Sequence, residues 1–150
     1  MSYLFHAFLR TDPPPAEGTK DYLLEGALFD EQPTIVFELD ALGEFQSMRL
    51  KYDAKRRPLI LRRLRGDESD AARGEVVDEA NLWCGEFIAK AIEAAPVVIE
   101  WEVERNELDE DAWFALHLWQ AWVLKPAGGL LYAPGDGIFN AELRRLGGPR

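Results

Sequence analysis

The chain has 150 residues and a mass of 17.0 kDa, which is the size of one domain able to bury a hydrophobic core. Hydrophobic residues make up 47% and aromatic residues 11%, a composition that excludes an intrinsically disordered chain. The net charge of −10 argues against binding of nucleic acid or an anionic membrane over the whole surface. The one cysteine, Cys84, excludes an intramolecular disulfide and a cysteine-rich zinc site.

The first residues lack the features of a targeting signal. The apolar run in SYLFHAFLR is short and no basic stretch precedes it. No segment approaches the roughly 20 apolar residues of a membrane-spanning helix. We therefore expect a cytoplasmic protein without a membrane partner.

Alternating side-chain character predicts four strands in the first half of the chain. They cover residues 3–10, 34–40, 45–52 and 58–65. The last three follow one another at short spacing, which favours an antiparallel meander. Between the first two strands, residues 19–30 fit either a helix or a strand.

The second half predicts two helices, one strand and a hairpin. A long helical pattern begins at GDESD and ends at Pro96, and a second helix runs from Asp109 to about Leu124. VVIEWEVER alternates as a strand, and PGDG has the chemistry of a hairpin turn. The order β-βββ-α-β-α-ββ predicts one α+β domain over residues 1–150, with two main helices packed on a mostly antiparallel sheet.

No motif identifies catalytic, cofactor-binding or metal-binding residues. Cys84 could act as a nucleophile with His6 or His117 as its base, but its helical spacing places it in an apolar stripe, where a free cysteine is a small core residue. That predicted stripe consists of Val77, Ala80, Cys84, Phe87, Ile88 and Ala91.

The glycines of PAGGLLYAPGDG do not have the spacing of a phosphate-binding loop, and they follow a helix instead of preceding one. The ligand spacings of zinc and calcium sites are also missing. We therefore expect no cofactor.

Basic residues concentrate in one predicted hairpin. Eight basic side chains stand against one acidic one between residues 49 and 65, a local charge of +7, which leaves −17 for the rest of a chain of net charge −10. These cations either protect the hairpin from edge-to-edge strand pairing or bind an anionic partner. The candidate anion-binding residues are Arg49, Lys51, Arg56, Arg57 and Arg63.

Acidic residues concentrate between positions 100 and 111, in EWEVERNELDED. Side chains of alternate residues in a strand lie about 7 Å apart on one face, so the strand acids repel one another unless cations lie beside them. Either the basic hairpin or a basic partner supplies those cations. The candidate partner-binding residues are Glu100, Glu102, Glu104, Glu107, Asp109, Glu110, Trp119 and Trp122.

The two tryptophans belong to AWFALHLWQAWVL, a helix that is apolar nearly all round. Such a helix is either wholly buried or shared with a partner, and tryptophan is enriched in interface hot spots.

We therefore expect a non-enzymatic module that binds a basic protein partner or forms a homo-oligomer. In general class alone, this profile is similar to that of bacterial immunity proteins, which neutralise toxins. One alternative is an enzyme in which dispersed carboxylates and a histidine meet in a cleft. The other is binding of nucleic acid or another anion by the 49–65 hairpin, which the overall negative charge opposes.

Overall fold

A computed structural model describes residues 2–26 and 33–149. The strands are β1 (Ser2–Leu9), β2 (Thr34–Leu39), β3 (Phe45–Lys51), β4 (Leu59–Leu64), β5 (Val97–Glu104), β6 (Leu130–Ala133), β7 (Gly137–Phe139) and β8 (Arg145–Gly147). The helices are α1 (Ala16–Gly26), α2 (Gly66–Cys84), α3 (Glu86–Ala94) and α4 (Glu110–Ala127), with a 3-10 turn at Arg105–Glu107.

The eight strands form one antiparallel sheet in the order β2-β3-β4-β5-β1-β6-β7-β8. β1 lies in the middle and pairs along its whole length with β5, from Ser2 opposite Glu104 to Leu9 opposite Val97. β4 pairs with the other side of β5. The α+β class, the mostly antiparallel sheet and the meander of β2, β3 and β4 are confirmed.

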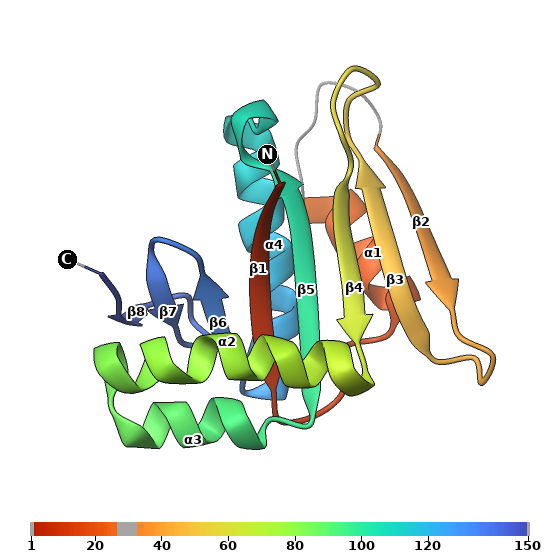
Figure 1. Ribbon diagram of the computed structural model, residues 1–150. Coiled ribbons are helices and arrows are strands. Elements are labelled where there is room, and N and C mark those ends of the chain that lie inside the picture. Colours follow the sequence, from red (N-terminus) through yellow and green to blue (C-terminus); the bar gives the residue numbers. More distant parts are fainter. Residues whose placement is uncertain (1, 27–32, 150) are drawn as a thin grey trace.

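Helices cover both faces of the sheet and create two cores (Figure 1). Alternate residues of the central strands, such as Phe5 and Trp101, pack with α1 and α4 in the larger core. The intervening residues, such as Phe8 and Val98, pack with α2 and α3 in the smaller one. Successive side chains of each central strand point to opposite faces of the sheet, so the strands contribute apolar residues to both cores.

The prediction of one long helix before Pro96 is wrong, because Gly85 divides it into α2 and α3. Gly85 has φ 94° and ψ 174°, a backbone conformation that is essentially restricted to glycine. The apolar stripe predicted along this helix is therefore not fully buried: Cys84 is only partly buried, and Phe87 is 79% exposed. The buried residues of these helices are Ser69, Ala72, Val76, Ala80, Ala89 and Ile92, and Val77, Cys84 and Ile88 of the predicted stripe pack against the same core while partly exposed.

Three further differences concern the ends of elements. Residues 19–26 of the segment left open belong to α1, whereas 27–30 lie outside the described residues. α4 continues past Leu124 to Ala127 with Pro126 inside it, and Gly128 in the left-handed conformation follows it. β8 extends the predicted C-terminal hairpin by one strand. In the part of the chain that the structure describes, no helix combines the length and apolar character needed to cross a membrane.

α2 and α3 cross the sheet near one end of its central strands, and no helix of the described residues covers the other end of that face (Figure 1). One row of paired residues runs across it through five strands: Val36, Arg49, Ile60, Glu102 and Leu4. We call this row and its neighbours on the same side the open sheet face. It mixes charged and apolar side chains, and all five members of the row are at least partly exposed.

Candidate functional site

The basic hairpin and the acidic strand are neighbours in the sheet. Arg62 on β4 lies opposite Glu100 on β5. Its guanidinium donates to Glu100 Oε1 at 2.8 Å and to Glu102 Oε2 at 3.0 Å. The strand acids therefore have an internal cation beside them.

The turn before β4 makes the same kind of contact with the segment after β5. The backbone N–H of Arg57 donates to Glu107 Oε2 at 2.9 Å, and the Arg57 guanidinium lies 3.3 Å from Glu104 Oε2. Arg56 donates to the carbonyl of Glu107 and lies 3.6 Å from Asp109 Oδ2. Much of the charge asymmetry seen in the sequence is thus neutralised within the molecule.

The remaining anion-binding candidates differ in whether they already form an ion pair within the molecule. Arg63 donates to Asp12 at 3.0 Å. Arg49 and Lys51 are exposed on β3 and form no ion pair with another described residue. The anion-binding capacity predicted for the hairpin is therefore reduced to the outer part of the open sheet face.

The tryptophan candidates have opposite environments. Trp119 is fully buried and packs edge to face on Trp101, with ring centroids 6.3 Å apart, so its side chain cannot contact a partner. Trp122 is partly exposed, and its Nε1 donates to Thr19 Oγ1 at 3.0 Å. Helical spacing alone does not tell which of two tryptophans three residues apart faces the core.

The acids at the start of α4 have local roles. Asp109 caps the helix, because its Oδ1 accepts from the Ala112 N–H at 2.8 Å. Glu110 is exposed in the first turn, where the helix dipole favours a negative charge. These contacts account for the acidic cluster without a ligand.

A cavity of about 510 Å³ opens beside the open sheet face, between the first residues of β1, helix α2 and β6. We call it the acidic cavity, because two carboxylates line it and His6 is the only basic side chain among the described residues of its wall. Its lining residues are Ser2, Tyr3, Leu4, His6, Glu75, Glu79, Tyr132 and Pro134.

His6 joins this cavity to the charged strand pair. The residue is 6% exposed, and its Nε2 lies 3.0 Å from Glu100 Oε2. The hydrogen bond with His6, aided by the charge of Arg62, holds the pKa of Glu100 below its ordinary value although burial opposes this. His6 Nδ1 is buried and forms no hydrogen bond with a described residue.

The two tyrosines of the cavity are neutral at physiological pH. Tyr132 donates its hydroxyl proton to Glu79 Oε2 at 3.0 Å. Burial, together with the bond to Glu79 and its charge, raises the pKa of Tyr132 to about 12. Burial also raises the pKa of Tyr3, whose hydroxyl donates to the carbonyl of Pro134. The charge of the cavity wall therefore comes from Glu75 and Glu79.

Neither carboxylate forms an ion pair with any residue in the described ranges. Glu75 and Glu79 are four residues apart on α2, a spacing at which like charges repel each other. Sequence reasoning missed them because they belong to a helix whose buried face it identified only in part. Their common helical face was readable, but the strands that this face meets were not.

The other catalytic candidates of the sequence do not form a site. Burial raises the pKa of the Cys84 thiol, so it is protonated and poorly nucleophilic. His117 is exposed and stacks on Trp113, with ring centroids 5.7 Å apart. Over residues 2–26 and 33–149, the structure holds no group of three His, Cys, Asp or Glu side chains placed to bind a metal ion.

Comparison with protein-family models gave no match, and neither the curated proteins nor the solved structures that were searched gave one.

Proposed function

We propose that this protein is a non-enzymatic binding module for a basic protein partner, and that the acidic cavity receives a lysine or arginine side chain of that partner. The observation that carries the proposal is that two carboxylates, Glu75 and Glu79, lie in the wall of a cavity large enough for such a side chain and form no ion pair with any described residue. An incoming cation would relieve their mutual repulsion and form charge-assisted hydrogen bonds.

The aromatic neighbour strengthens the preference for a cation. Tyr132 lines the same cavity, and the face of a tyrosine ring attracts ammonium and guanidinium groups. Its hydroxyl is bonded to Glu79, which orients both side chains before a ligand arrives. Preorganisation of this kind reduces the entropy cost of binding.

The surroundings favour a protein over a small molecule. The cavity adjoins the open sheet face, and Leu4 belongs to both. Exposed apolar and charged side chains, among them Val36 and Arg49, continue the surface across β3 and β2. A mixed surface with one anchoring hollow is the arrangement found at protein interfaces.

The geometry of His6 supports binding instead of acid–base catalysis. Its Nε2 is engaged with Glu100, and its Nδ1 is buried, so neither nitrogen is placed to exchange a proton with a substrate in the cavity. A role in fixing the cavity wall agrees better with these contacts. The partner's identity and a homo-oligomeric alternative stay predictions.

The first test is a titration observed by NMR. The probe is a blocked Gly-Gly-Arg-Gly-Gly peptide, and its control replaces arginine by citrulline, which is neutral and of nearly equal shape. We expect the arginine peptide to shift the amide resonances of Leu4, His6 and Tyr132 saturably. The E75Q/E79Q variant should weaken this binding about tenfold, the worth of one charge-assisted hydrogen bond.

The matched control variant is E110Q/D111N, which removes the same two charges from the exposed start of α4. It should change the affinity less than twofold. Equal losses in both variants would mean that only the overall charge attracts the peptide, and an absence of saturable shifts would contradict the cavity as the site. A partner retained from lysate supports the proposal only if the arginine peptide displaces it and E75Q/E79Q does not retain it.

A further inference from the structure

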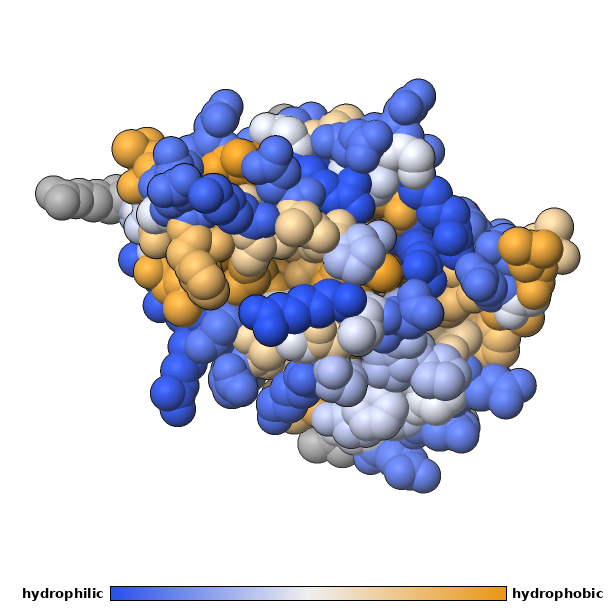
Figure 2. Space-filling view, turned by 90° about the horizontal axis from the view of Figure 1, so that it is seen from below, coloured by the Kyte–Doolittle hydropathy of each residue, from blue (hydrophilic) through white to orange (hydrophobic). Residues whose placement is uncertain are grey.

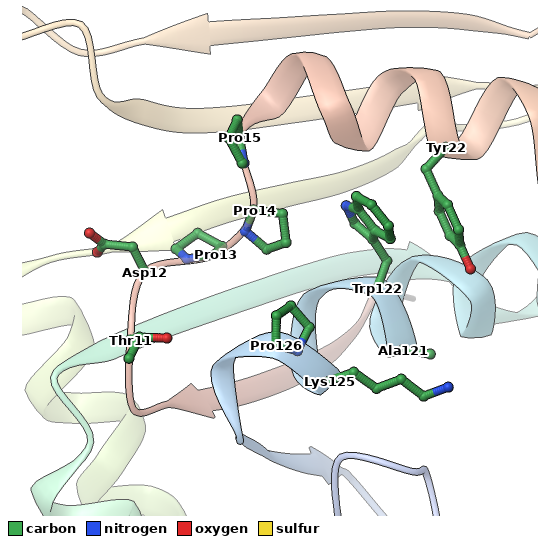
Figure 3. A pocket seen from close by; sticks show the side chains of 10 residues that line it. All are labelled: Thr11, Asp12, Pro13, Pro14, Pro15, Tyr22, Ala121, Trp122, Lys125 and Pro126. Atoms are coloured by element: carbon green, nitrogen blue, oxygen red, sulfur yellow. The ribbon is translucent and has the colours of Figure 1, made fainter.

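A second and larger cavity lies on the other side of the molecule, against α1 and α4. Its volume is about 850 Å³, within the range of small-molecule sites. The β1–α1 loop forms one wall and the last turns of α4 form the other (Figure 3). We call it the proline cavity; it is lined by Thr11, Asp12, Pro13, Pro14, Pro15, Tyr22, Ala121, Trp122, Lys125 and Pro126.

The loop wall is stiff and apolar. Three consecutive prolines, Pro13 to Pro15, have a fixed φ and no backbone N–H to be satisfied by water or a ligand. The carbonyl of Pro15 accepts from both the N–H and the hydroxyl of Thr19, each at 3.0 Å, which ties the loop to the first turn of α1. A ligand would therefore meet a wall that is already ordered.

The aromatic side chains are also held in place. Trp122 and Tyr22 stack with ring centroids 4.1 Å apart and an angle of 17° between the planes. The Trp122 N–H is used by Thr19 Oγ1 at 3.0 Å, so the indole offers apolar and stacking contact without a hydrogen-bond donor. The indole points from α4 toward the proline loop, beside Tyr22 (Figure 3).

A ligand in the proline cavity would meet a charge that its lining does not neutralise. Asp12 is engaged by Arg63 at 3.0 Å. Lys125 is exposed in the last turn of α4 and forms no ion pair within the described part of the chain. The unpaired charge at the proline cavity is therefore positive, whereas the molecule as a whole carries −10.

We infer that the proline cavity binds a small organic anion with a flat aromatic ring. The ring packs between the proline loop and the Trp122 indole, and the anionic group lies at the Lys125 ammonium. Stacking and apolar contact with one orienting charge is the usual composition of such a site. This site is separate from the acidic cavity and does not depend on the function proposed for it.

The test uses 2-naphthoate and its neutral counterpart 2-naphthalenemethanol, each titrated into the full chain. The readout is the indole N–H resonance of Trp122. We expect 2-naphthoate to shift this resonance saturably. The K125M variant should lower the affinity for 2-naphthoate at least fivefold and change the affinity for the alcohol less than twofold.

Two further variants separate the cavity from general effects. K55M removes a positive charge from the exposed β3–β4 turn and should leave both affinities unchanged. A121L should narrow the cavity while the Trp122 hydrogen bond is kept, and it should therefore lower the affinity for both probes. If neither probe shifts the indole resonance, the site is overturned; if both bind equally and K125M changes neither, the anionic class is overturned.

Discussion

Glu100 is the residue at which the basic strand, the acidic strand and the buried histidine meet. Its Oε1 accepts from Arg62 at 2.8 Å, and its Oε2 lies 3.0 Å from His6 Nε2. The side chain is 12% exposed, so water screens these contacts weakly. A carboxylate with two such partners favours its charged form, which agrees with its lowered pKa.

The substitution E100Q keeps the shape of Glu100 and removes its charge. We expect a loss of about 1 to 3 kcal/mol in the free energy of unfolding at pH 7, measured by urea denaturation. Because the folded-state pKa lies below the unfolded one, the stabilisation is present above the unfolded pKa and disappears as pH falls through the folded one. The difference between wild type and E100Q should therefore shrink below about pH 4.

The control for this prediction is E93Q, which removes a charge from an exposed position of α3. It should change stability by less than about 0.5 kcal/mol at every pH. A difference between wild type and E100Q that persists unchanged to pH 2 would show that the loss comes from packing instead of charge.

Residue-level prediction from the sequence worked where a local rule applies. Asp109 caps α4, and its acidic neighbours lie in the first turn, as helix-dipole reasoning expects. The same reasoning did not separate Trp119 from Trp122, because the helix is apolar nearly all round and its rotation is set by the sheet. Tertiary packing fixes what the local pattern leaves open.

At the scale of elements, the division between α2 and α3 was the main error of sequence reasoning. The helical pattern continues across Gly85, since glycine within a helix costs only about 1 kcal/mol and does not by itself end it. The chain turns there because α2 and α3 pack side by side over one end of the sheet. Figure 2, which views the molecule from that end, shows hydrophilic residues over most of the surface, with hydrophobic residues exposed between them from one side to the middle and again at the opposite side.

Two glycine substitutions test this turn, because we expect them to change the free energy of unfolding in opposite directions. G85A places a Cβ in open space but in a backbone conformation that alanine avoids, so it should cost about 1 to 3 kcal/mol. G74A lies inside α2, where the new Cβ also meets nothing, and should stabilise by about 0.5 to 1 kcal/mol. Thermal and urea unfolding of both variants measures the difference. Equal effects of the same sign would contradict a turn that depends on the φ of Gly85.

At the scale of the whole molecule, the strand content was predictable and the strand order was not. β1 and β5 are far apart in the chain, yet they pair from Ser2 opposite Glu104 to Leu9 opposite Val97. Alternation is visible within a strand, but it carries no information on which distant strand lies beside it. The acidic cavity combines residues of β1, α2 and β6, so it was beyond local patterns for the same reason.

This pairing changes the meaning of the net charge. Part of the +7 of residues 49–65 lies beside part of the −17 elsewhere, because Arg56, Arg57 and Arg62 pair with acids of β5 and of the segment after it. Glu75 and Glu79, which form no ion pair with any described residue, lie outside the segment where the sequence concentrates its acids. Local charge density along the chain is therefore a poor guide to the surface potential of a sheet with distant strands paired.

Two arginines of equal exposure form ion pairs of different burial: the side chains of Arg62 and Arg65 are both 42% exposed. Arg62 joins Glu100 and Glu102, which are 12% and 29% exposed, whereas Arg65 joins Asp40 and Glu44, which are 24% and 57% exposed. R62M should lower the free energy of unfolding by about 1 to 2 kcal/mol because it leaves a mostly buried carboxylate with one partner fewer. R65M should cost less than about 0.5 kcal/mol, and about 0.5 M salt should abolish its effect but not that of R62M. Equal losses in urea unfolding, or equal sensitivity to salt, would mean that the β4–β5 ion pairs contribute no more than ordinary surface pairs.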